Sequence, residues 1–257
     1  MDTMRLCVLI LCLVCSFISG SELKEKPMNT NPRNVLESSQ DKEQLMQAAI
    51  SLARSGQPAD QKILLKFLQS SEFLLRLNSK KEYGRSREFL LIGELLTELS
   101  QNRSPVAQDT LIKLTQSQEF VNEVSRIQLL IEAAASVYPA PADLIVFWER
   151  YAHPETDTVD LVIQALMTNA NLPALQLFEK KMTDTAYSDN SKIYWMHYYI
   201  IPHRYNPGVL KTCEQLLQMN ISEKLKQNLI ETVFDYQPEW YKPHSDTVHD
   251  KRGIFSI

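Results

Sequence analysis

Two histidines and two aspartates near the C-terminus have side chains that could carry out chemistry. They are His244, Asp246, His249 and Asp250, within the stretch YKPHSDTVHDKRGIFSI. Imidazole nitrogens and carboxylate oxygens are common ligands of transition metals, and a bound metal can activate water for hydrolysis. The stretch is polar, contains proline and has no helical period that would direct both rings at one ion, so a solvated tail is the preferred interpretation. If these side chains do act together, the chain is an exported metal-dependent or acid/base hydrolase, and this is the alternative function. No cofactor is predicted.

A second unusual stretch is rich in aromatic side chains. The segment 191–205, SKIYWMHYYIIPHRY, contains four tyrosines, one tryptophan, two histidines and one arginine. Aromatic rings with a polar tip bury much area at small entropic cost, which favours them at binding surfaces. The alternative is a helix with apolar side chains in the core and tyrosines at its rim. We predict a binding surface that includes the following residues: Trp148, Tyr151, Trp195, His197, Tyr198, Tyr199 and Arg204.

Cys213 is the one cysteine outside the N-terminal region, because Cys7, Cys12 and Cys15 lie in an apolar leader. It falls at helical spacing with the apolar residues around it, which predicts a core position. A buried thiol is unreactive because desolvation disfavours the thiolate. No internal disulfide is expected once the leader is removed.

Composition argues against several classes of protein. Six glycines in 257 residues is about a third of the usual proportion, which disfavours phosphate-binding loops and hairpin-rich all-β folds. The net charge of −4 lacks the concentrated basic excess that nucleic-acid binding needs. The partners expected are proteins or peptides, with no nucleic acid. No acidic pair stands out by its spacing as a general acid and base.

Two asparagines begin N-glycosylation sequons. Asn220 lies in the triplet Asn-Ile-Ser, and Asn102 lies in Asn-Arg-Ser, which is followed by proline. The second is the poorer acceptor sequence. Either would matter only in a eukaryotic secretory pathway.

A repeated stretch shows which elements must position these side chains. Residues 59–73, ADQKILLKFLQSSEF, recur 47 residues later as VAQDTLIKLTQSQEF, with seven of fifteen positions identical. Each copy follows a proline, Pro58 or Pro105. Proline is accepted at the first position of a helix because that N–H has no intrahelical partner. Further prolines at similar separations precede or interrupt comparable segments: Pro141, Pro173, Pro207 and Pro238.

Over roughly residues 41–236, the repeated prolines and LxxL-like second helices resemble the HEAT and armadillo class of helical repeats. The resemblance implies an all-α fold, an α-solenoid of stacked antiparallel helix pairs, in which stacking supplies the core that no single repeat can form. A tetratricopeptide-like array and an irregular helical bundle are the alternatives. In such a solenoid the identical residues of the two copies are expected to form the stacking contacts.

The chain divides into four predicted parts. Residues 1–20 read as a signal peptide, since Arg5 precedes a 13-residue apolar run and then small residues. Residues 21–40 are expected to be a flexible linker, 41–236 the helical-repeat domain and 237–257 a C-terminal tail. After removal of the leader no transmembrane helix is expected, and an uncleaved leader acting as a membrane anchor is the alternative.

These features together predict an exported protein, periplasmic or extracellular, that acts as a scaffold or adaptor for a protein or peptide partner. An enzyme is the less favoured interpretation. The long groove that stacked repeats create typically binds extended ligands.

Overall fold

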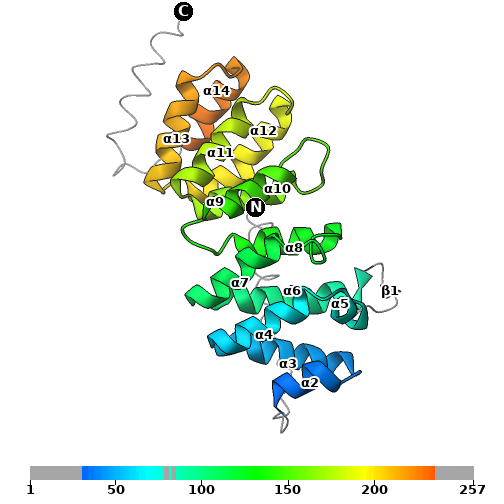
Figure 1. Ribbon diagram of the computed structural model, residues 1–257. Coiled ribbons are helices and arrows are strands. Elements are labelled where there is room, and N and C mark those ends of the chain that lie inside the picture. The colour runs from blue at the N-terminus through cyan, green and yellow to red at the C-terminus, as the bar shows by residue number, and fades with distance from the viewer. Residues whose placement is uncertain (1–30, 78–80, 83–84, 235–257) are drawn as a thin grey trace, which may run out of the picture.

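The computed structural model describes residues 31–77, 81–82 and 85–234, and within these ranges its regular elements are helices and one pair of short strands (Figure 1). The two strands, β1 (Lys81–Glu82) and β2 (Arg85–Ser86), pair antiparallel. The α-helices are α2 (Pro32–Ser38), α3 (Lys42–Ser55), α4 (Pro58–Leu68), α5 (Ser71–Leu77), α6 (Arg87–Gln101), α7 (Pro105–Thr115), α8 (Val124–Ala134), α9 (Ala142–Tyr151), α10 (Val159–Asn169), α11 (Leu172–Thr183), α12 (Asp189–Trp195), α13 (Pro207–Gln218) and α14 (Glu223–Leu229). Three short elements complete them: the π-helices η1 (Met196–Ile200) and η3 (Ile230–Phe234) and the 3₁₀-helix η2 (Ile201–His203). The predicted all-α class is confirmed.

The repeated stretch of sequence forms two helices of the same length. Helices α4 and α7 are both 11 residues long and both carry proline at their start. Leu64 and Leu111, which are identical in the two copies, are fully buried. Lys66 and Lys113 are also identical and are exposed. Sequence identity between the copies therefore covers surface as well as core positions, and the expectation that the identical residues form the stacking contacts is only partly met.

The turn that follows each of these helices is also reproduced. The hydroxyl oxygen of Ser70 accepts from the backbone N–H of Phe73 at 3.4 Å, and that of Ser117 accepts from Phe120 at 3.4 Å. Both phenylalanine rings are buried, with exposed fractions of 1% and 0%. A serine turn that places an aromatic ring in the core thus recurs at the same position in each copy.

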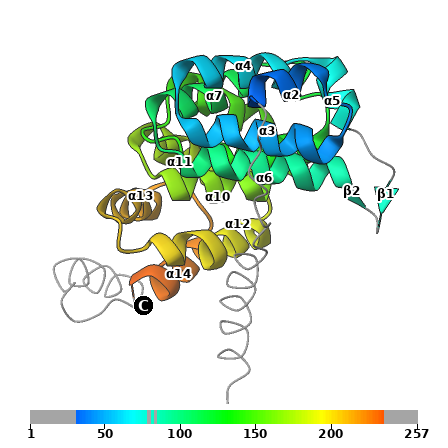
Figure 2. The ribbon, with the colours of Figure 1, turned by 90° about the horizontal axis from the view of Figure 1, so that it is seen from below.

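The helices form two rows that run along the length of the molecule. In one row, α3 contacts α6, α6 contacts α8, α8 contacts α10, and α10 contacts η1. In the other row, α4 contacts α7, α7 contacts α9, α9 contacts α11, and α11 contacts α13. Figure 1 shows the helices in chain order from α2 to α14, and Figure 2, viewed from the α2 end, shows α4 and α7 on one side of α3 and α6. One continuous core lies between the rows.

Asparagine side chains attach the loops of successive helix pairs to one another. Asn102, after α6, donates to the carbonyl oxygen of Ala53 at the end of α3 over 2.7 Å. Asn169, at the end of α10, donates to the carbonyl of Val137 over 2.6 Å. Buried amides stabilise loops in this way because a carbonyl left without a donor in the core is costly.

The linker expected over residues 21–40 is wrong for its second half. Helix α2 begins at Pro32, where Asn31 caps it, and buries Val35 and Leu36 against α3 and α4. Two adjacent apolar residues in a polar stretch are too few to produce a helical period, so the sequence pattern missed this helix. The guanidinium of Arg33 also pairs with Asp60 of α4 at 2.7 Å.

Other predicted parts of the chain lie outside the described residues. These are the signal peptide at 1–20, the first ten residues of the expected linker and the tail at 237–257. Among the described residues, no helix combines the length and the apolar character needed to cross a membrane.

Candidate binding surface

The aromatic segment is one helical rod whose hydrogen-bonding pattern changes twice. It begins as α12, becomes the π-helix η1 at Met196 and ends as the 3₁₀-helix η2. The N–H of Ile201 bonds to the carbonyl of Met196, which is the i to i−5 pattern of a π turn. Pro202 explains the change, because it has no N–H to offer the carbonyl of Tyr198 and its ring would collide with that carbonyl in an α-helix.

The buried side of this rod includes Trp195, Met196 and Ile200, each with an exposed fraction of 0%. The indole N–H of Trp195 donates to a carboxylate oxygen of Asp160 over 2.7 Å, and the Tyr187 ring packs edge-on against the indole with centroids 5.1 Å apart. Burial raises the pKa of Tyr187 to about 12. Trp195 is therefore a core residue that joins α12 to α10.

The predicted placement of both tryptophans on the binding surface is wrong. Trp148 is also completely buried. Tyr151 is half-buried, with its ring edge-on to Phe147 at 5.0 Å. An indole is the largest apolar side chain, and in each case a neighbouring helix covers it, so two of the seven predicted residues stabilise the fold instead of facing solvent.

The rest of the rod carries tyrosines, exposed at Tyr194, Tyr198 and Tyr205 and half-buried at Tyr199. Together with the half-buried Arg204, we call these residues the tyrosine surface. Rings 194 and 198, one helical turn apart, lie with centroids 4.4 Å apart at 33°. Ring 199 meets ring 194 edge-on at 5.9 Å. Tyr194, Tyr198 and Tyr205 are 41%, 62% and 45% exposed.

Contacts within the tyrosine surface hold several of its side chains in place. The guanidinium of Arg204 lies 4.9 Å from the centroid of the Tyr205 ring and donates to its hydroxyl oxygen over 3.0 Å. Desolvation and a hydrogen bond with Tyr194 raise the pKa of Tyr199. Rings that are already ordered lose little entropy when a partner covers them.

The two histidines of the segment behave differently. His197 is exposed, and its Nε2 atom lies 3.4 Å from the amide nitrogen of Asn228. His203 is half-buried, and desolvation lowers its pKa, which favours the neutral ring at neutral pH. His197 is thus the histidine that faces solvent beside the tyrosine surface.

The sequence indicates this segment but only some of the residues that form its tyrosine surface. Of the predicted residues in this segment other than Trp195, His197 and Tyr198 are exposed, and Tyr199 and Arg204 are half-buried. Tyr194 and Tyr205 are exposed but are not among the predicted residues. The spacing of four between the first two tyrosines of the segment was the available signal, since residues four apart lie on one helical face.

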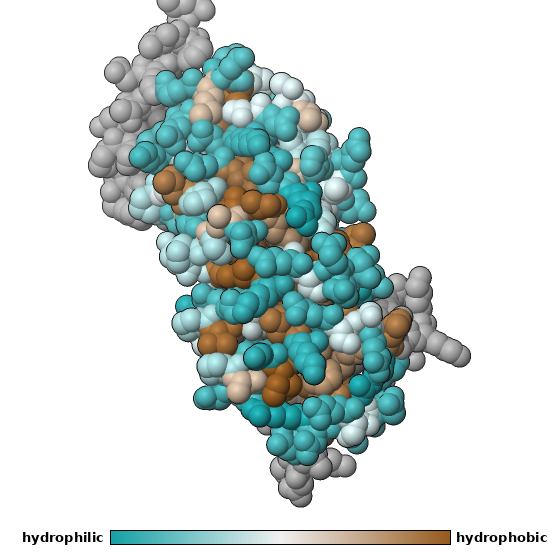
Figure 3. Space-filling view, in the orientation of Figure 1, coloured by the Kyte–Doolittle hydropathy of each residue, from teal (hydrophilic) through white to brown (hydrophobic). Residues whose placement is uncertain are grey.

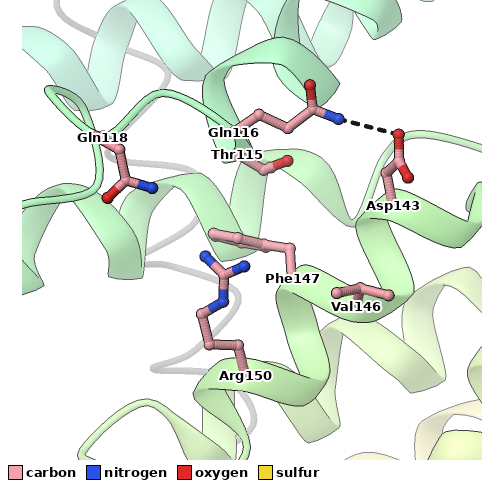
Figure 4. Close-up of a pocket in the computed structure, with 7 residues that line it drawn as sticks. All are labelled: Thr115, Gln116, Gln118, Asp143, Val146, Phe147 and Arg150. Carbon is pink, nitrogen blue, oxygen red and sulfur yellow. Dashed lines mark hydrogen bonds between the residues drawn. The ribbon is translucent and has the colours of Figure 1, made fainter.

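A shallow hollow between α7 and α9 is a second feature, and the sequence did not indicate it (Figure 4). Its volume is about 270 Å³. The lining residues are Thr115, Gln116, Gln118, Asp143, Val146, Phe147 and Arg150. Gln116, just after α7, donates to the carboxylate of Asp143 at the start of α9 over 2.9 Å. Four residues of α9 at helical spacing line it, but only the packing of α7 against α9 reveals the hollow.

Apolar surface is divided into small areas on the face shown in Figure 3, where hydrophilic side chains separate them. The exposed large apolar side chains are likewise distributed over many elements: Leu75, Val124, Tyr138, Val146, Leu172, Tyr194, Tyr198 and Tyr205. Only in the aromatic segment do three of them fall within twelve consecutive residues. Along the described sequence, exposed large apolar side chains are thus most closely spaced in the tyrosine surface.

The remaining candidates for chemistry are the thiol of Cys213 and the metal ligands predicted near the C-terminus. Cys213 is completely buried, as predicted, and burial raises the pKa of its thiol to about 12. Among the described residues there is no group of three or more His, Cys, Asp or Glu side chains that could hold a metal ion. The candidate ligands His244, Asp246, His249 and Asp250 lie outside those residues, so the hydrolase alternative stays a prediction.

Comparison with known proteins finds no matching family model, no matching curated protein and no matching solved structure.

Proposed function

We propose that this chain is an exported α-solenoid of the HEAT and armadillo kind that binds a protein or peptide partner through the tyrosine surface. The observation that carries the proposal is the cluster of ordered, exposed tyrosine rings on a helical rod whose opposite side is in the core. Tyrosine and arginine are the residue types that dominate the energy of protein interfaces.

Three observations support a solenoid. Helices α4 and α7 repeat in length, start and following turn, contacts in each row join successive helices, and ion pairs link neighbours in the stack. Arg54 of α3 pairs with Glu98 of α6 at 2.7 Å, and Lys180 of α11 pairs with Glu149 of α9 at 2.6 Å. Nearest-neighbour contacts of this kind are what defines a repeat array.

The test is site-specific photocrosslinking followed by a measured affinity. A crosslinking amino acid replaces Tyr198 in one variant and Leu75, which is 68% exposed on α5, in a control variant. A partner captured only from position 198 is then purified, and its affinity is measured for the double variant Tyr194→Ala/Tyr198→Ala. We expect a loss of about tenfold or more, since interface tyrosines at hot spots contribute ~2 kcal/mol.

Leu172→Ala is the matched control, because Leu172 is 69% exposed and lies outside the tyrosine surface. Its affinity for the partner should be unchanged. Thermal unfolding should show that the double variant keeps the wild-type fold. The absence of a position-specific adduct, or an unchanged affinity in the double variant, would show that the tyrosine surface is not the contact.

A further inference from the structure

Asn-X-Ser triplets occur twice in this chain, at Asn102 and Asn220. A sequon becomes a modification site only where the folded chain leaves room for a bulky, hydrated glycan, which in practice means an exposed loop. The two triplets lie in different surroundings, and the structure distinguishes them.

Asn220 lies in the turn between α13 and α14 and is exposed. Its side chain forms no hydrogen bond to any other described residue, so its amide nitrogen is available. The adjacent backbone is fixed by a hydrogen bond from the N–H of Ile221 to the carbonyl of Met219, at 2.9 Å. Ile221 is buried, with 8% exposure, and anchors the turn while the residue before it faces solvent.

The third residue of this triplet, Ser222, caps α14. Its hydroxyl oxygen accepts from the N–H of Leu225 at 3.2 Å and donates to Asp189 over 2.7 Å. Threonine could perform the same capping function, since Thr is also an accepted N-cap residue. The triplet can therefore be changed in a way that keeps both the cap and the sequon.

Asn102 is unsuitable on the same criteria. It is half-buried, and its amide nitrogen donates to Ala53 over 2.7 Å while its carbonyl oxygen accepts from the N–H of Ser104 at 3.2 Å. A Cβ atom placed on Gly56 would lie only 3.4 Å from the same amide nitrogen. A glycan there would have to separate α3 from the loop that follows α6.

We propose that Asn220 is the N-glycan acceptor of this chain in a eukaryotic secretory pathway, reached through the predicted leader at 1–20. The co-reactant is a lipid diphosphate-linked oligosaccharide. The amide nitrogen of Asn220 forms a bond to the anomeric carbon of the first sugar and loses one proton. The bond from that carbon to the diphosphate oxygen breaks, and the lipid diphosphate leaves with the electron pair. No oxidation or reduction takes place.

The acceptor lies near the start of the rod that carries the tyrosine surface. Ser222 contacts Asp189, the first residue of α12, and Tyr194 lies five residues further along the same rod. This proposal is independent of the partner-binding function, and either can fail without the other.

The experiment is translation of the full chain in the presence of rough microsomes, with translocation scored separately by protection from added protease. We expect the protected chain to carry one glycan, which endoglycosidase H removes. The glycan lowers the mobility of the chain in gel electrophoresis. Asn220→Gln should abolish this mobility shift, and Ser222→Thr should keep it. Asn102→Gln, the matched control, should leave it unchanged.

Three results would overturn the proposal: a protected chain without a glycan, a glycan that persists in Asn220→Gln, and a chain that stays outside the microsomes and never meets the transferase. A second glycan that disappears in Asn102→Gln would refute the argument from burial by which Asn102 was set aside.

Discussion

The thiol of Cys213 illustrates how burial decides the chemistry of a single side chain. The residue is completely buried on α13, and desolvation raises its pKa to about 12, whereas the pKa of an unfolded cysteine is ~8.5. Between pH ~8.5 and about 12, the Cys213 thiol therefore keeps its proton in the folded chain but loses it in the unfolded chain. The thiol's contribution to the free energy of unfolding is complete below pH ~8.5 and is lost as the pH rises toward about 12.

This shift predicts a thiol that does not react until the protein unfolds. In a chain whose three N-terminal cysteines are replaced by serine, a disulfide reagent at pH 8 should label Cys213 very slowly in buffer and rapidly in denaturant, because only the thiolate attacks. The rate is followed by the absorbance of the released thiol. Rapid stoichiometric labelling of the native protein would contradict complete burial.

Residue-level prediction from sequence succeeded where a local pattern decided the outcome. Cys213 was placed in the core by its spacing with apolar neighbours, and this is confirmed. Trp148 and Trp195 were placed on the surface by their residue type, and this is wrong. Both are buried because other helices pack against them, and the residues next to each tryptophan in the sequence do not show which helices those are.

The change from α to π to 3₁₀ geometry in the aromatic rod is the main feature at the scale of elements. Pro202 is the second residue of the 3₁₀-helix that follows the π turn, and π turns occur frequently at functional sites. An inserted residue rotates the side chains that follow by about 100° relative to an uninterrupted α-helix. The π turn therefore fixes the direction of Arg204 and Tyr205 relative to Tyr198.

Replacing this proline should change the geometry of the rod without unfolding it. In Pro202→Ala the new N–H can bond to the carbonyl of Tyr198, so we expect the π turn to become α-helical and Arg204 to rotate away from its present position. Thermal stability should be equal or slightly higher, because alanine has the best helix propensity. Amide chemical shifts across residues 196–205 report the change, and partner affinity should fall.

Pro58→Ala is the matched control for this change, because Pro58 occupies the first position of α4, where no intrahelical bond is lost. It should leave the shifts of the aromatic segment unchanged. If Pro202→Ala also leaves them unchanged, packing rather than the proline imposes the π turn.

For the whole molecule, the two rows of helices mean that each helix is stabilised mainly by the helices next to it. Contacts pass from α4 to α7, α9, α11 and α13 in one row and in the same stepwise manner in the other. Such a stack should unfold as coupled neighbours and not as one rigid unit. An irregular bundle with a shared centre would respond as a whole.

Leu111→Ala separates these two cases. Leu111 is fully buried on α7, so its truncation should cost about 2–5 kcal/mol. Hydrogen exchange should show the greatest loss of protection in α7 and in the helices that it contacts, α4, α6, α8 and α9, and little loss in α13. Lys113→Ala on the exposed face of the same helix is the control, with an expected effect within ~0.5 kcal/mol. An equal loss of protection in α13 would argue against a solenoid.

The sequence by itself determined the helices and the repeat. Prolines at helix starts, capping residues such as Asp41 and Ser104, and apolar spacing act over a few residues, so they can be read locally. The 47-residue offset predicted that α4 and α7 would correspond, and the structure shows the same length and the same turn in both.

Only the tertiary structure decided which side of each helix faces water. Trp195 is buried because Asp160 and Tyr187 meet it, the hollow exists because α7 lies against α9, and α2 is ordered because α3 and α4 cover Leu36. Burial is set by surfaces that come from distant parts of the chain. The pattern within one segment shows that a helix has two unlike faces, but the neighbouring helices determine how much of each remains exposed.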